Sequence, residues 1–107
     1  MNVTYGQGAF LQDRMKIPGT IILSDHKIYI KQDGEDLPQT FVPLEKIERI
    51  QLSGHVLSID VRPAIMSRYR AAFEAEKRNI TELTHEIVKR RGLKKRFLRN
   101  EWVEVPA

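Results

Sequence analysis

A dense run of positive charge lies in the C-terminal third of the chain. Seven of the eleven residues from position 89 to position 99 are basic and none is acidic: Lys89, Arg90, Arg91, Lys94, Lys95, Arg96 and Arg99. Leu93, Phe97 and Leu98 lie among them, and such a segment is attracted to acidic membrane surfaces. Nucleic-acid phosphates or an acidic protein would attract the same charges. Cations near a helix C-terminus also favour the helix dipole and solubility, so the pattern predicts anion binding without naming the anion.

Other polar residues have the types of catalytic or metal-binding groups but not their arrangement. Ser24, Asp25 and His26 are sequence neighbours in a predicted turn, so their side chains diverge, whereas the members of a catalytic triad converge from separate segments. His26, His55 and His85 show no ligand spacing, and we expect no metal site. The chain has no cysteine, which excludes disulfides, thiolate zinc sites and a cysteine nucleophile. We predict no catalytic residue, no cofactor and no small-molecule substrate.

A few carboxylates and aromatic residues leave two interpretations open. Glu45, Glu48 and Asp60 could pair across strands, but no feature marks one of them as buried, so acid–base catalysis is not predicted. Phe97 and Trp102 could stack on bases or insert at a lipid interface. The simpler interpretation is that both are core anchors that hold the tail against the sheet.

The composition is typical of a single ordinary domain. The chain has 107 residues, of which 41% are hydrophobic and 30% charged. Its net charge of +4 is uneven, because residues 1–61 hold six basic and eight acidic residues whereas residues 62–107 hold twelve and six. The first ten residues have neither a basic region nor an apolar run, and no stretch approaches the roughly 20 apolar residues of a membrane span. We therefore expect no signal peptide and a cytoplasmic location.

Short β-branched and alternating runs predict an antiparallel sheet before position 62. Five strands are expected, at 20–23, 27–31, 40–42, 47–52 and 57–61, and the alternating residues 101–105 could add a sixth. Leu44–Lys46 predicts a tight bend, and Ser53 with Gly54 is a hairpin signal. Residues 1–16 are weakly patterned, so we expect a flexible lead-in or a short edge strand there. One face of this sheet needs cover.

One long helix, from Pro63 to Arg91, is predicted to supply that cover. Its apolar residues follow helical spacing: Met66, Tyr69, Phe73, Ile80, Leu83 and Ile87. Pro63 suits a first helical turn, and Gly92 suits the position just past a helix end. Such a helix is about 43 Å long and overhangs five-residue strands of about 17 Å. We therefore predict that the second half of the helix, with Ile80, Leu83 and Ile87, pairs with a second copy of the chain.

Residues 17–75 resemble the pleckstrin-homology-like superfamily, especially its bacterial and GRAM-like members. The run GTIILSDHKIYIK resembles the family's strand pair, and Val42-Pro43-Leu44-Glu45-Lys46-Ile47 resembles its bend before the next strand. The resemblance implies a barrel-like sheet, usually of seven strands, with a C-terminal helix at one open end. It also implies a binding or assembly role without catalysis, often at membranes or in oligomers. It implies no particular functional residue.

These observations predict an α+β fold, a small antiparallel β-sheet or partial barrel of five to six strands capped by one long C-terminal helix. The single domain, residues 1–107, would comprise a β-rich part at 17–62, the helix at 63–91 and a basic tail at 92–107. The predicted function is a non-enzymatic binding or assembly module that forms homo-oligomers through the helix or binds a protein partner. The alternative is recognition of nucleic acid or an acidic membrane through residues 89–99. An Sm-like RNA-binding barrel would be one such fold, although its helix normally precedes the strands.

Overall fold

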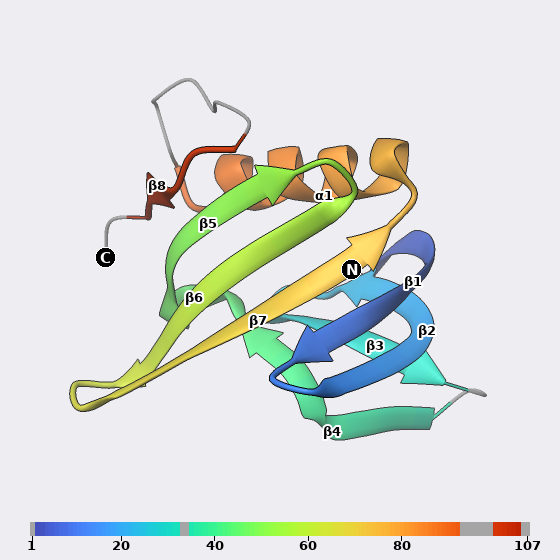
Figure 1. Cartoon of the computed structure of the whole chain (residues 1–107), viewed down its shortest axis with the longest axis horizontal. Helices are drawn as coiled ribbons and strands as arrows, with labels where there is room; N and C mark the ends of the chain where they lie inside the picture. The colour runs from blue at the N-terminus through green and yellow to red at the C-terminus, as the bar shows by residue number, and fades with distance from the viewer. Residues whose placement is uncertain (1, 33–34, 93–99, 106–107) are drawn as a thin grey trace.

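A computed structural model describes residues 2–32, 35–92 and 100–105 of the chain (Figure 1). The described residues form eight strands: β1 (Val3–Gln12), β2 (Met15–Leu23), β3 (Lys27–Gln32), β4 (Glu35–Pro43), β5 (Ile47–Ser53), β6 (Val56–Ala64), β7 (Ser67–Ala75) and β8 (Val103–Glu104). One turn of 3-10 helix, η1 (Leu44–Lys46), precedes β5, and the helix α1 (Lys77–Arg90) follows β7. The α+β class and the antiparallel sheet are confirmed, but the count of five to six strands is wrong.

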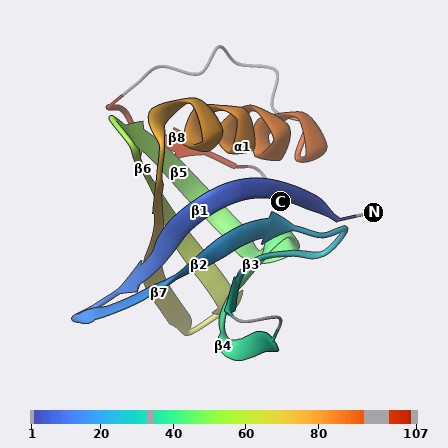
Figure 2. The ribbon, with the colours of Figure 1, turned by 90° about the vertical axis from the view of Figure 1, so that its right-hand side faces the viewer.

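All eight strands belong to one antiparallel sheet with the order β4-β3-β2-β1-β7-β6-β5-β8. Figure 2 shows the halves β1–β4 and β5–β7 at a steep angle to each other, with α1 lying across the end where they diverge. The predicted strands lie within β2 to β6, and the predicted bend is η1. Gly92, with a φ of 67°, has the left-handed conformation expected just past a helix end.

The first strand joins the two halves of the sheet. Residues 8–11 of β1 pair with residues 72–75 of β7, while the other side of β1 pairs with β2. Gly8 allows this approach, because a Cβ atom there would collide with the carbonyl oxygen of Glu74 and lie 2.7 Å from Ile21 Cδ1. The prediction of a lead-in or a short edge strand at residues 1–16 is therefore wrong. β1 is a central strand.

The predicted helix at residues 63–91 is also wrong in its first half. Residues 67–75 form β7, in which Ala71, Phe73 and Ala75 are buried at alternate positions. Alanine and arginine are good helix formers, but intrinsic helix propensity is small in free energy, and pairing with β1 and β6 on both sides overrides it. The remaining helix has 14 residues, about 21 Å, so it does not overhang the sheet. It is not the last element either, because β8 follows it.

The core lies between the sheet and α1. Phe10 and Phe73 meet edge to face across the β1–β7 junction, with ring centroids 5.4 Å apart. Ile80, Leu83 and Ile87 of α1 have no exposed surface and belong to the same core cluster. These three side chains therefore fill their own chain's core, and the predicted pairing of this face with a second copy loses its geometric basis.

Candidate functional site

The predicted anion-binding residues divide at the end of α1. Lys94, Lys95, Arg96 and Arg99 lie outside the described residues, so their part in binding stays a prediction. Lys89 is exposed on the last helical turn. Arg90 donates from Nε to Glu86 Oε1 (3.1 Å) and from Nη1 to the carbonyl oxygen of Ser24 (2.8 Å). Arg90 therefore fastens the helix end to the β2–β3 turn.

Arg91 lines a small cavity beside this contact. The cavity has a volume of about 250 Å³, and its lining is Asp25, His26, Leu44, Glu45, Arg90 and Arg91. Two carboxylates face two guanidinium groups there, so the lining carries no clear excess of either charge. The arrangement does not favour a free anion.

The Ser24-Asp25-His26 run lies in the turn between β2 and β3, as its turn chemistry predicted. Ser24 Oγ accepts hydrogen bonds from the main-chain N–H groups of His26 (3.3 Å) and Lys27 (3.1 Å). These bonds build the β2–β3 turn, as serine commonly does. In residues 2–32, 35–92 and 100–105, no group of three or more His, Asp or Glu side chains could hold a metal ion. In the same ranges no helix is long and apolar enough to cross a bilayer.

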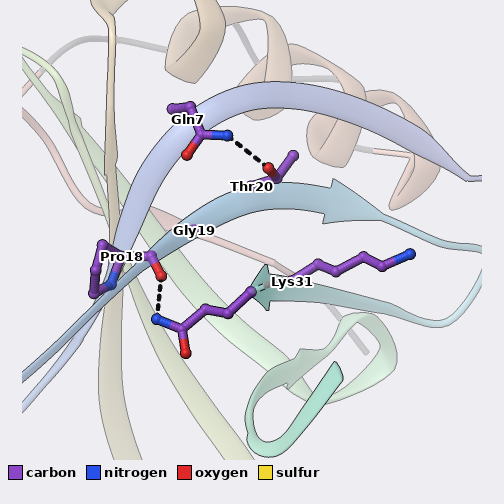
Figure 3. A pocket seen from close by; sticks show the side chains of 6 residues that line it. Gln7, Pro18, Gly19, Thr20 and Lys31 are labelled. Carbon is purple, nitrogen blue, oxygen red and sulfur yellow. Dashed lines mark hydrogen bonds between the residues drawn. The ribbon is translucent and has the colours of Figure 1, made fainter. Parts of the chain in front are cut away.

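A polar hollow of about 310 Å³ lies over β1, β2 and β3 (Figure 3). Gln7 Nε2 donates to Thr20 Oγ1 (2.8 Å), and Gln32 Nε2 donates to the carbonyl oxygen of Pro18 (2.6 Å). Lys31 is the one ionisable residue in the lining, and its side chain extends away from the two amides in Figure 3. The hollow can offer hydrogen bonds, but it brings no acid and base together.

The most exposed apolar side chains lie at the tip of the β6–β7 hairpin. Ile65 and Met66 are 87% and 96% exposed. Ala64 pairs with Ser67, so these two residues are the whole loop. Figure 1 shows the hairpin reaching well beyond the rest of the molecule. An exposed pair of large apolar residues on a projection is typical of a contact site.

Arginines lie directly behind this tip on both strands. Arg62 on β6 and Arg68 on β7 each place Nη2 near Glu48 Oε1 of β5, at 3.6 Å and 3.0 Å. Two positive charges share one carboxylate, so the base of the tip keeps a net positive charge. We call Arg62, Ile65, Met66 and Arg68 the hairpin tip site.

A second arginine cluster lies on the outer face of β5, β6 and β7. Asp60 Oδ2 accepts a hydrogen bond from Arg49 Nε (2.5 Å), and Asp60 Oδ1 accepts one from Arg70 Nε (2.7 Å). Burial alone would raise the pKa of the Asp60 carboxyl, but the hydrogen bonds and charges of Arg70 and Arg49 outweigh it and hold that pKa below its ordinary value. The Trp102 ring lies against both guanidinium groups, with its centroid 4.7 Å from Arg49 Cζ and 4.5 Å from Arg70 Cζ. Trp102 thus holds the tail against the sheet, but on its outer face and not in the core as the simpler interpretation predicted, and Phe97 lies outside the described residues.

The hairpin tip site was not predicted from the sequence, because the helical spacing of Met66, Tyr69 and Phe73 placed Met66 on a helix. The signal that could have found it is the alternation of Tyr69, Ala71 and Phe73 with charged or small residues, which has the period of a strand. If residues 67–75 had been predicted as a strand, the preceding Ile65 and Met66 would have been predicted to lie in a loop.

Comparisons of this chain with family models, with curated proteins and with solved structures find no match.

Proposed function

We propose that this chain is a non-enzymatic binding module of pleckstrin-homology-like architecture that attaches to acidic membrane surfaces through the hairpin tip site. The observation that carries the proposal is the exposure of Ile65 and Met66 in front of two arginines. Acidic lipids are concentrated in the cytoplasmic leaflet, which fits the predicted cytoplasmic location.

The strand order supports the architecture. Seven strands precede α1, and they follow the order β4-β3-β2-β1-β7-β6-β5. The resemblance in the sequence implied seven strands and a helix at one open end. The main departure is β8, which adds a short strand beside β5.

The spacing within the tip matches the layers of a bilayer. Arg62 lies three residues before Ile65 and Arg68 two residues after Met66, about 10 Å and 7 Å along an extended strand. The headgroup region is about 5–8 Å thick on each side of the hydrocarbon core. When Ile65 and Met66 reach the acyl chains, Arg68 therefore lies within the headgroup region and Arg62 at its outer boundary, where their long side chains can reach the lipid phosphates, which arginine binds well.

The expected attachment is weak and reversible. Burial of an isoleucine or methionine side chain contributes about 1.5–3 kcal/mol each, and each arginine near an acidic surface contributes about 1 kcal/mol. Together these terms correspond to a dissociation constant between about 1 and 200 µM. High salt should weaken the contribution of the two arginines to the binding free energy and leave the contribution of the two apolar side chains unchanged.

Co-sedimentation with phosphatidylcholine vesicles, with and without phosphatidylserine, tests this proposal. We expect the natural chain to pellet with the acidic vesicles and the Ile65→Ser, Met66→Ser double variant to bind at least about tenfold more weakly, since a tenfold loss corresponds to only about 1.4 kcal/mol. Arg62→Ala with Arg68→Ala should remove the preference for phosphatidylserine.

Met15→Ser is the matched control, because Met15 is a methionine, 43% exposed, on the β1–β2 hairpin. It should change binding by less than about twofold. The double serine variant should keep its free energy of unfolding within about 0.5 kcal/mol, as expected for exposed sites. A natural chain that stays in the supernatant, or a double serine variant that binds like the natural chain, would rule the proposal out.

A further inference from the structure

Residues 100–105 lie along the edge of β5 as a bound peptide would. The main-chain N–H of Asn100 donates to the carbonyl oxygen of Leu52, and that of Val105 donates to the carbonyl oxygen of Glu48, both at 2.8 Å. Between these two bonds, Val103 lies opposite Ile50 in antiparallel register. Main-chain pairing of this kind is how an extended peptide adds a strand to an exposed sheet edge.

The sheet provides a prepared support for the tryptophan of this segment. Arg49, Asp60 and Arg70 are cross-strand neighbours on β5, β6 and β7. The Asp60 side chain is only 14% exposed and holds both guanidinium groups in place. Trp102 lies against these groups at distances typical of cation–π contacts. Because the carboxylate orders the arginines, little ordering cost remains when an aromatic ring binds.

The aliphatic residues of the segment face the other way. Val105 is buried at 6% exposure and belongs to the core cluster, and Val103 packs against that cluster. Successive side chains of a strand point to opposite faces, so an aromatic residue outside and two valines inside form one extended recognition pattern. We call the β5 edge together with the Arg49–Asp60–Arg70 group the tail site. This site binds a segment that has this pattern.

We propose that the tail site is a peptide-binding site, filled within one chain by residues 100–105, and that a second copy of the chain can fill it with the same segment. The second copy is the occupant that the structure supports, because it carries the one sequence already seated there. This inference does not depend on membrane attachment. It places self-association at the β5 edge and not on the buried face of α1.

Two full-length variants test the tail and the tail site independently of each other. Trp102→Ala weakens the tail and keeps the site. Arg49→Gln with Arg70→Gln removes the guanidinium groups, keeps hydrogen-bond donors for Asp60 and leaves the tail intact. In an equal mixture, the intact tail of the second variant should enter the intact site of the first. We expect a heterodimer of twice 12.5 kDa by sedimentation, while each variant alone stays mainly monomeric.

Tryptophan fluorescence gives an independent readout of the mixture. The chain has one tryptophan, so after mixing only the Arg49→Gln, Arg70→Gln variant contributes a signal, and that signal should change on binding. A labelled peptide of residues 100–105 should also bind the Trp102→Ala variant at least about tenfold more tightly than the natural chain, whose own tail competes at an effective concentration of the order of millimolar.

The inference is overturned if the mixture stays monomeric and its fluorescence equals the sum of the parts. Far-UV circular dichroism checks that both variants are folded. If the double glutamine variant is not, Arg70→Gln alone replaces it, because the Arg70 side chain is 58% exposed and its loss should be tolerated.

Discussion

At Gly8 the two halves of the sheet leave no room for a side chain. The neighbours of Gly8 are the main chain of Glu74, the side chain of Ile21 and the Cβ of Ala75, and a Cβ atom would meet all three. The main chain cannot move aside as a flexible side chain can. Gly54, in the β5–β6 turn, has the opposite surroundings, with a φ of 61° and nothing within 4 Å of an added Cβ.

This contrast gives a prediction at the residue scale. Gly8→Ala should lower the free energy of unfolding by about 3 kcal/mol, because it forces β1 and β7 apart. Gly54→Ala, the matched control, should cost only about 1–2 kcal/mol from its left-handed backbone. Urea unfolding of both variants measures the difference. Equal losses would mean that close packing at Gly8 does not hold the halves together.

At the scale of elements, the strands, bend and helix end that were predicted correctly are those whose sequence pattern fits only one local structure. The alternation in β3 and β6, the bend at η1 and the glycine after α1 all follow from local chemistry. The β7 sequence does not, because Met66, Tyr69 and Phe73 also fit the spacing of a helix. Pairing with β1 and β6 decided the outcome, and β1 is distant from β7 in the sequence.

The same reason explains what could be predicted of the candidate sites. The charge of the C-terminal third and the anchoring role of Trp102 were visible in the sequence. The hairpin tip site was not predicted, because residues 63–66 were assigned to a helix, and the tail site was not, because it forms only when residues 100–105 meet β5 and the Arg49–Asp60–Arg70 group. Asp60, for example, meets Arg49 and Arg70 only after β5, β6 and β7 have paired.

The Asp60 carboxyl leads to a prediction about the outer face of β5–β7. Its pKa is lowered in the folded chain, so its contribution to stability is present above the ordinary value near 3.8 and is lost as the pH falls through the lowered value. Protonation loosens the two guanidinium groups that support Trp102. We therefore expect a step in Trp102 fluorescence below pH 3.8, and Asp60→Asn should abolish it.

Glu48, Glu74 and Glu104 are the other carboxylates on β5, β7 and β8, so their replacement by glutamine, one at a time, serves as the control and should keep the step. If Asp60→Asn retained it, the titrating group would be another carboxyl, and Asp60 would not order the support of Trp102.

At the scale of the whole molecule, the two proposed sites would strengthen each other. A single hairpin tip binds weakly by the estimate above. Two copies joined through their tail sites would carry two tips, and a second tip that reaches the same membrane binds at a high effective concentration. A dimer should therefore hold a membrane much more firmly than a monomer does.

The depth of the hairpin tip in a bilayer tests the central claim most directly. The chain has no cysteine, so Met66→Cys and His85→Cys can each carry a single environment-sensitive fluorophore. His85 is exposed on α1, and Figure 1 shows α1 on the other side of the molecule from the β6–β7 hairpin tip. With phosphatidylserine-containing vesicles, we predict that the label at 66 shifts to the blue and is quenched by nitroxides on the acyl chains, while the label at 85 does neither. A label at 66 that stays in water while the chain is bound to the vesicles would contradict the account.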